Sequence, residues 1–162
     1  MLIVCTRDQS IVEAALDPRS GAQHWGALRV LNPDLTQEGA THAIAVALSE
    51  LDNGEPLCFS AHGNNKMIGD DHWQWTYEDI TRLLTEHTNG YSGPILIHAC
   101  ATEIVNFSAH LAVKLEKELE RMLAFRGTCV YGYNRSVPID TRFPRPDLLD
   151  RQVDLQVTCV TR

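Results

Sequence analysis

The chain lacks any hydrophobic run that approaches the ~20 residues needed to cross a bilayer as a helix. Its apolar start, residues 1–5, lacks the basic residues and the length of a signal peptide, and it predicts a first buried strand instead. We therefore expect a protein with no membrane partner. It would act in the cytoplasm or be delivered into a host or target cell as an effector.

Basic residues are also scarce: the chain has 14 Lys and Arg and 21 Asp and Glu, for a formal net charge of −7. Such a balance argues against a nucleic-acid partner. The chain contains neither the G-x-x-x-x-G-K-[ST] phosphate loop nor the dinucleotide-binding G-x-G-x-x-G pattern. His62, His72 and His98 lack the spacing of metal ligands, so we expect neither a metal nor a cofactor.

Cysteines are few and widely spaced. The chain has five, an odd number, with no C-x-x-C pair, which indicates neither a disulfide framework nor a zinc site. Four lie inside apolar runs and are expected to be small buried hydrophobic residues in a reduced compartment: Cys5, Cys58, Cys129 and Cys159. Cys100 differs, because it ends its apolar run and is followed by Ala-Thr-Glu.

The length of 162 residues predicts one domain, residues 1–162, that can bury a core. Strands are predicted at residues 2–6, 27–31, 57–61, 95–99, 128–133 and, as an edge strand, 154–161. Helices are predicted at residues 37–51, capped by Thr36, at 77–87, capped by Thr76, and at 108–125. This alternation favours an α/β three-layer sandwich, with a mostly parallel central sheet of about six strands and helices on both faces. Residues 63–76 and 134–151 are expected to be loops, the first of them functional.

Two of the predicted strands end in reactive side chains. One runs into His62 and Gly63, and another runs into Cys100. If these strands are parallel neighbours, both side chains emerge at the carboxyl edge of the sheet, where open α/β sheets place their ligand sites. A histidine beside a cysteine is the minimal machinery for catalysis by a thiol nucleophile.

A hydrophobic strand ending in His-Gly, followed by one ending in Ala-Cys, resembles the caspase-like (clan CD) cysteine peptidases. That superfamily includes CHAT domains and the self-processing domains of bacterial toxins. The matching segments are residues 59–63 and 97–100, and the resemblance extends over roughly residues 55–135. It implies a caspase-like fold, with Cys100 as nucleophile and His62 as general base or acid. The backbone N–H groups of Gly63 and Cys100 would form the oxyanion hole.

The chain departs from caspases at His98, which stands where Gln is typical. By strand alternation His98 shares a face of the sheet with Cys100, which would allow it to support the pair. A histidine inside a buried strand is more often a core residue with satisfied hydrogen bonds, and we favour that interpretation.

Three residues are candidates for binding substrate. The resemblance places Arg135 near the substrate cleft, where it could meet an acidic side chain, whereas acidic residues in the same area would suit a basic one, so this choice stays open. Trp73 and Asp71 follow His62 in a polar, aromatic segment. Trp73 either lines the cleft or anchors the segment, and Asp71 either contacts substrate or serves ordinary turn chemistry.

The function implied is that of a cysteine endopeptidase acting on a protein or peptide substrate, such as an effector, a toxin or a regulatory protease. Two alternatives remain open: a catalytically inactive caspase-like binding or scaffold module, and another thiol acyl-transfer enzyme that uses the same His62 and Cys100. The sequence does not indicate the oligomeric state, the substrate or the activating signal.

Overall fold

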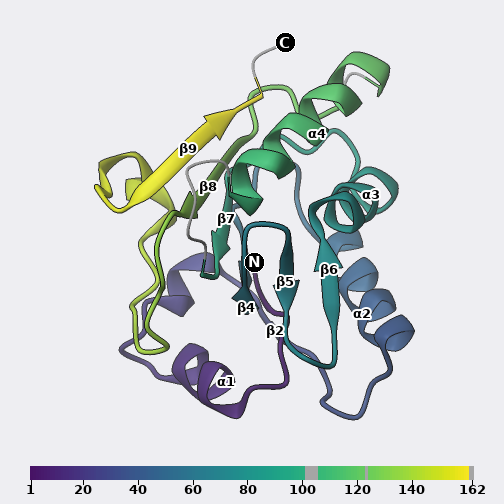
Figure 1. Ribbon diagram of the computed structural model, residues 1–162. Coiled ribbons are helices and arrows are strands. Elements are labelled where there is room, and N and C mark those ends of the chain that lie inside the picture. The colour runs from purple at the N-terminus through teal and green to yellow at the C-terminus, as the bar shows by residue number, and fades with distance from the viewer. Residues whose placement is uncertain (101–105, 123, 161–162) are drawn as a thin grey trace.

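The computed structural model describes residues 1–100, 106–122 and 124–160 (Figure 1). Six strands form its main sheet, in the spatial order β2-β1-β3-β7-β8-β9. Their bounds are β1 Leu2–Val4, β2 Leu28–Val30, β3 Leu57–Ser60, β7 Ile95–His98, β8 Cys129–Tyr133 and β9 Leu155–Cys159. All neighbours pair in parallel except β9, which runs antiparallel to β8 at the edge. The prediction of an α/β fold around a mostly parallel sheet is confirmed.

Within the described ranges, four α-helices connect these strands, namely α1 Gln9–Leu16, α2 Gln37–Ser49, α3 Tyr77–His87 and α4 Phe107–Met122. Two 3₁₀ helices, Ala22–Trp25 and Pro146–Arg151, accompany them. The predicted caps are confirmed, because the Thr36 hydroxyl accepts from the Gly39 amide and the Thr76 hydroxyl from the Asp79 amide. Helix α1 was not predicted. Asp8 caps it by accepting from the Ser10 amide.

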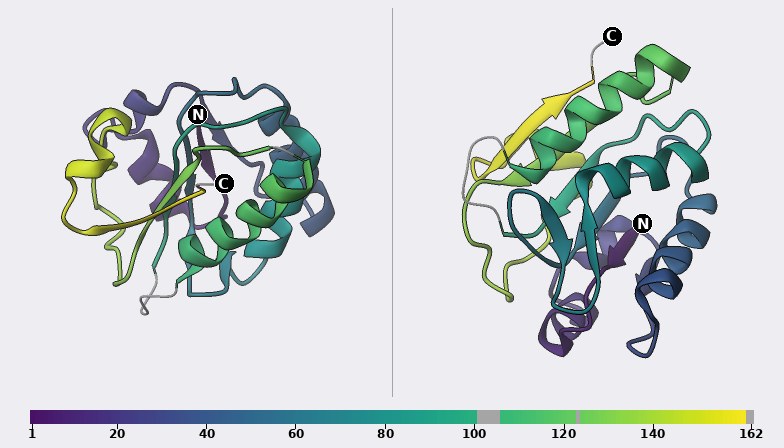
Figure 2. Two further views of the ribbon diagram at one scale, coloured as in Figure 1. Left: turned by 90° about the horizontal axis from the view of Figure 1, so that it is seen from above. Right: turned by 45° about the vertical axis from the view of Figure 1, so that its right-hand side comes forward.

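Helices pack on both faces of the sheet. In Figures 1 and 2, α2, α3 and α4 lie together on one side, and α1 lies on the other. Strand β1 shows why both faces are covered: Ile3 belongs to the core beneath α2–α4, whereas Leu2 and Val4 belong to the core that includes Ile11 and Val12 of α1. Successive side chains of a strand point to opposite faces, so an apolar strand needs cover on both.

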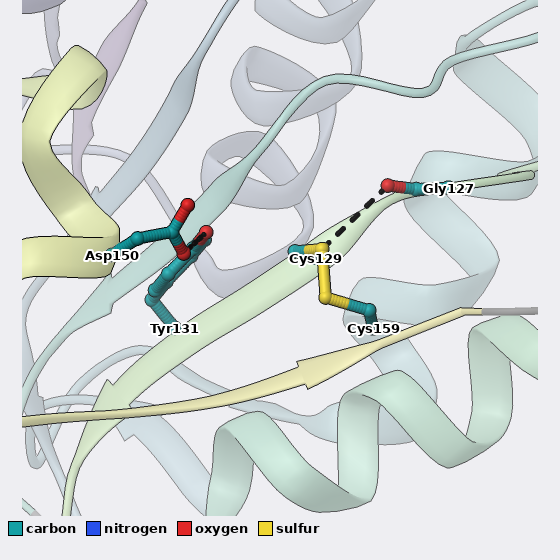
Figure 3. The surroundings of a disulfide bond; sticks show 5 residues. All are labelled: Gly127, Cys129, Tyr131, Asp150 and Cys159. Carbon is teal, nitrogen blue, oxygen red and sulfur yellow. Dashed lines mark hydrogen bonds between the residues drawn. A yellow bond between two sulfur atoms is a disulfide. The ribbon is translucent and has the colours of Figure 1, made fainter.

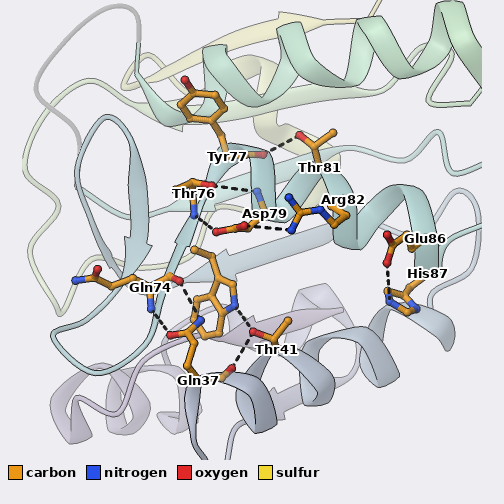
Figure 4. Close-up of polar contacts among 11 residues, drawn as sticks. Gln37, Thr41, Gln74, Thr76, Tyr77, Asp79, Thr81, Arg82, Glu86 and His87 are labelled. Atoms are coloured by element: carbon orange, nitrogen blue, oxygen red, sulfur yellow. Dashed lines mark hydrogen bonds and ion pairs between the residues drawn. The ribbon is translucent and has the colours of Figure 1, made fainter.

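Residues 63–76 are not the irregular loop that the sequence predicts. Three short strands, β4 His62–Gly63, β5 Met67–Gly69 and β6 Gln74–Thr76, form a second, antiparallel sheet. It docks on α2 through two hydrogen bonds between Gln37 and the backbone of Gln74 (Figure 4). The Trp75 indole N–H also donates to the Thr41 hydroxyl. Asn64 and Asp70 accept hydrogen bonds from the backbone in the two turns between these strands. Strands of two or three residues leave no periodic signal in the sequence.

The edge strand carries a disulfide that contradicts the cysteine prediction. Cys129 and Cys159 face each other across the β8–β9 pair and are bonded (Figure 3). Directly opposed side chains on antiparallel strands are close enough to bridge, but the sequence separation of 30 residues does not reveal that pairing. Cys5 and Cys58 are buried free thiols, as predicted, and burial raises the pKa of both.

No helix within the described part of the chain combines the length and the apolar character that spanning a membrane requires.

Candidate active site

Three neighbouring parallel strands carry polar side chains just beyond their carboxyl ends. Strand β1 leads to Asp8, β3 to His62 and β7 to Cys100. In the β3–β7 pair, Ser60 lies opposite His98, so His62 and Cys100 each follow their strand by two residues at the same edge of the sheet. The prediction that these strands are parallel neighbours is therefore confirmed. The strand order also reverses around β1, which is the kind of switch point where open α/β sheets bind ligands.

Asp8 is a partner of His62 that the sequence analysis missed. Its Oδ2 lies 2.6 Å from Nε2 of His62, while its Oδ1 accepts from the Ser10 amide at 2.9 Å. The hydrogen bond with His62, followed by the one from Ser10, lowers the pKa of Asp8. An ionised carboxylate in this position orients an imidazole and stabilises its protonated form. Asp8 follows β1 at the same sheet edge, so the rule that singled out His62 and Cys100 could have found it.

Asp70 fixes the chain on both sides of this pair. Its Oδ2 accepts from the Thr6 hydroxyl at 2.9 Å and from the Arg7 amide at 2.6 Å, just ahead of Asp8. Its Oδ1 accepts from the His72 and Trp73 amides. Burial raises the pKa of Asp70, but the backbone hydrogen bonds outweigh it and the pKa is lowered. Asp70 therefore ties the end of β1 to the small sheet that begins at His62.

Cys100 is partly buried beside the segment that follows β8. Its Sγ accepts a hydrogen bond from the Val137 amide at 3.2 Å and lies 3.7 Å from the Val137 carbonyl oxygen, to which the thiol can donate.

Cys100 and His62 share the wall of one cavity of about 220 Å³. The ends of β3 and β7 form its floor. The other described residues that line it are apolar: Ile11, Ala14, Val137, Pro138, Ile139 and Phe143. The two predicted catalytic side chains therefore face a common space that a substrate group can enter.

Gly63 allows the close approach of the two strand ends. A Cβ atom at this position would lie 2.9 Å from Cβ of Ala99, 3.1 Å from the Met67 carbonyl oxygen and 3.3 Å from the Cys100 carbonyl oxygen. Any larger residue would push β4 away from Cys100. Glycine is thus required here by packing, whatever its backbone N–H does in catalysis.

His98 differs from the satisfied core histidine that the sequence predicts. It is 6% exposed, and among the described residues its Nε2 has no hydrogen-bond partner. The ring packs against Phe143, with ring centroids 4.3 Å apart, and edge-on against Tyr133. Burial lowers the pKa of His98 to about 4, so the ring is neutral near pH 7. A buried polar atom left without a partner costs about 1–3 kcal/mol.

The three predicted substrate-binding residues have different surroundings. Asp71 is exposed and lines a second cavity with His62 and Gly63. Trp73 is fully buried and donates its indole N–H to the Leu35 carbonyl, so its role as a cleft residue is wrong and it anchors the small sheet instead. Arg135 pairs with Asp154 at 3.1 Å and does not line the cavity beside Cys100.

Among the residues described, no three His, Cys, Asp or Glu side chains are grouped so that they could hold a metal ion. A comparison of the sequence with protein-family models and with curated proteins found no match.

Proposed function

We propose that this protein is a caspase-like cysteine endopeptidase that uses Cys100 as nucleophile, His62 as proton carrier and Asp8 to orient His62. The observation that supports this best is the placement of the three side chains beyond adjacent parallel strands, with His62 and Cys100 lining one cavity. A nucleophile, a base and a group that orients the base are the parts of a catalytic triad, whatever the fold.

The proposed reaction begins when His62 takes the proton from Cys100 Sγ. The thiolate attacks the peptide carbonyl carbon, and the N–H groups of Gly63 and Cys100 hold the resulting oxyanion. The C–N bond then breaks as His62 passes its proton to the leaving amine, which leaves a thioester on Cys100. Water, deprotonated by His62, hydrolyses the thioester, and the proton returns to the thiolate. Asp8 stabilises the imidazolium formed at each transfer.

Thiol labelling tests this proposal directly, because the structure makes Cys100 the accessible thiol among the described cysteines. Cys5 and Cys58 are buried, and Cys129 and Cys159 are bonded to each other. Iodoacetamide should therefore add one carbamidomethyl group per wild-type chain, located on Cys100 by peptide mass mapping. The variant Cys100→Ala should take up none.

The informative comparison is between the wild type and His62→Ala. If His62 activates the thiol, the variant should be labelled about 10- to 30-fold more slowly near pH 7, because an ordinary thiol with a pKa near 8.5 is only about 3% thiolate there. Equal rates would contradict the catalytic pair and favour a binding module. Cleavage of a mixed peptide library, lost in both variants, would separate a peptidase from a thiol enzyme that only transfers acyl groups.

A further inference from the structure

The cavity beside Cys100 contains no charged side chain other than His62 among the described residues that line it. Apart from His62 and Cys100, the polar side chains among these described lining residues come from Ser60 and His98, which lie opposite each other on β3 and β7. Ser60 is 2% exposed and His98 is 6% exposed, so both belong to the floor of the cavity and not to its rim.

A charged substrate side chain would therefore be unpaired in this cavity. Transfer of a carboxylate or an ammonium group out of water is costly unless an opposite charge or several hydrogen bonds receive it. Arg135 is held by Asp154 outside the cavity, and Asp71 lines a different cavity with Gly63. The structure thus favours neither of the two specificities, acidic or basic, that the sequence leaves open.

His98 places a specific requirement on the substrate side chain, because its ring has a nitrogen that could pair with it. Its Nε2 is buried and has no hydrogen-bond partner within the part of the chain that the structure describes. His98 lies two residues before Cys100 and lines the same cavity. Same-face neighbours on a strand are ~7 Å apart, which is within reach of a side chain on the Cα next to the carbonyl carbon that Cys100 attacks. The low pKa of about 4 that burial gives to His98 keeps the ring neutral, with one donor and one acceptor nitrogen.

We infer that this cavity receives the substrate side chain on the amino side of the scissile bond, and that it selects an uncharged primary amide, Asn or Gln, which pairs with Nε2 of His98. This inference rests on the proposed function. An amide both donates and accepts, so it can pair with either tautomer of the ring, whereas a carboxylate has no donor and an ammonium has no acceptor.

The nitrogen is buried in this structure, and the ring of Phe143 packs against His98. The inference therefore requires the phenyl ring of Phe143 to turn aside when substrate binds, so that the amide can reach Nε2. The apolar walls then enclose the rest of the substrate side chain.

The test uses peptidyl acyloxymethyl ketones that are identical except at the residue next to the reactive group. The rate of alkylation of Cys100 is measured by intact mass for probes with Asn, Asp, Gln, Glu, Leu and Lys. We expect Asn to exceed Asp, and Gln to exceed Glu, by at least about 10-fold, because each pair has nearly the same shape and differs in charge and donor. The Lys probe should be among the slowest.

The variant His98→Phe removes Nε2 and retains an aromatic ring between Tyr133 and Phe143. It should lose the preference for Asn over Leu. Equal rates for the Asn and Asp probes, or an unchanged preference in His98→Phe, would overturn the inference. The Asn and Asp comparison uses the wild-type protein, so it decides the matter even if the variant does not fold.

Failure of the inference is distinguishable from failure of the proposed function. If iodoacetamide labelling of Cys100 depends on His62 but the Asn and Asp probes react alike, the catalytic pair stands and only the specificity is wrong. If labelling does not depend on His62, both are wrong.

Discussion

Asp8 and His62, 54 residues apart in the chain, share a contact of 2.6 Å between Oδ2 and Nε2. The same carboxylate begins helix α1 through the Ser10 amide. One side chain therefore serves two purposes, a structural one at the helix N-terminus and an electrostatic one at the imidazole. The two purposes can be separated, because asparagine caps helices about as well as aspartate but carries no charge.

We expect Asp8→Asn to keep its melting temperature close to that of wild type and to lower the rate of Cys100 alkylation by about 10-fold or more. The loss should vanish in the His62→Ala background, because Asp8 acts on the thiol through His62. The measurement is a double-mutant cycle of iodoacetamide rate constants. Additive losses in the double variant would show that Asp8 has no functional connection to His62.

Gly63→Ala should destabilise the protein by about 1–3 kcal/mol, the usual cost of forcing an extra carbon into a packed site. The new Cβ would lie 2.9 Å from Cβ of Ala99, so it should also move the backbone of Cys100 and slow its alkylation. Gly54→Ala is the matched control, because a Cβ there meets nothing within 4 Å. Denaturant unfolding of both variants measures the difference, and equal stabilities would contradict the packing argument.

Much of the fold follows from local signals in the sequence. Buried strands such as Leu57–Ser60 and Ile95–His98 are short apolar runs bounded by turns, and Thr36 and Thr76 mark helix starts that the structure reproduces. Helix α1 could not be predicted from local sequence signals, because it has only eight residues and its apolar stripe is short. The strands of the second sheet could not be predicted from them either, because their pairing depends on docking against α2 and α3.

The candidate site likewise has a part that local sequence patterns reveal and a part that depends on contacts between distant segments. His62 and Cys100 are visible because each ends an apolar run, so a local pattern marks both. The disulfide, the ion pair of Arg135 with Asp154 and the burial of Trp73 depend on which distant segments meet. Both Cys159 and Asp154 become partners only through the antiparallel placement of β9 and the turn that precedes it, which no local pattern specifies.

Reduction of the disulfide should weaken the attachment of β9. It closes a loop with a sequence separation of 30 residues, for which the loop-entropy relation gives about 3–4 kcal/mol at 25 °C. We expect dithiothreitol to lower the melting temperature of the wild type, and the double variant Cys129→Ser/Cys159→Ser to melt at a similarly reduced temperature.

The double variant also serves as the control, because dithiothreitol should not change its melting temperature further. A wild-type melting temperature that is insensitive to dithiothreitol would show that the bond adds nothing to stability. The number of free thiols per chain, measured before and after reduction, verifies that the disulfide is present in the sample.

The buried imidazole of His98 should make stability depend on pH in the mildly acidic range. The unfolded chain binds a proton on this ring near its ordinary pKa of 6.5, whereas burial lowers the pKa in the folded chain to about 4. Between these values the unfolded state holds more protons, so the free energy of unfolding falls as the pH is lowered from about 6.5 to 4. The full loss is on the order of 3 kcal/mol.

His98→Phe should abolish most of that loss, since phenylalanine does not titrate and still packs against Phe143 and Tyr133. The measurement is urea unfolding of both proteins at a series of pH values from 8 to 4.5. The two curves should run parallel above about pH 7 and diverge below about pH 6.5, where only the wild type loses stability to protonation of this ring. Curves that stay parallel over the whole range would show that protonation of His98 does not cause the loss of stability at low pH. That result would argue against a neutral His98 ring in the cavity floor.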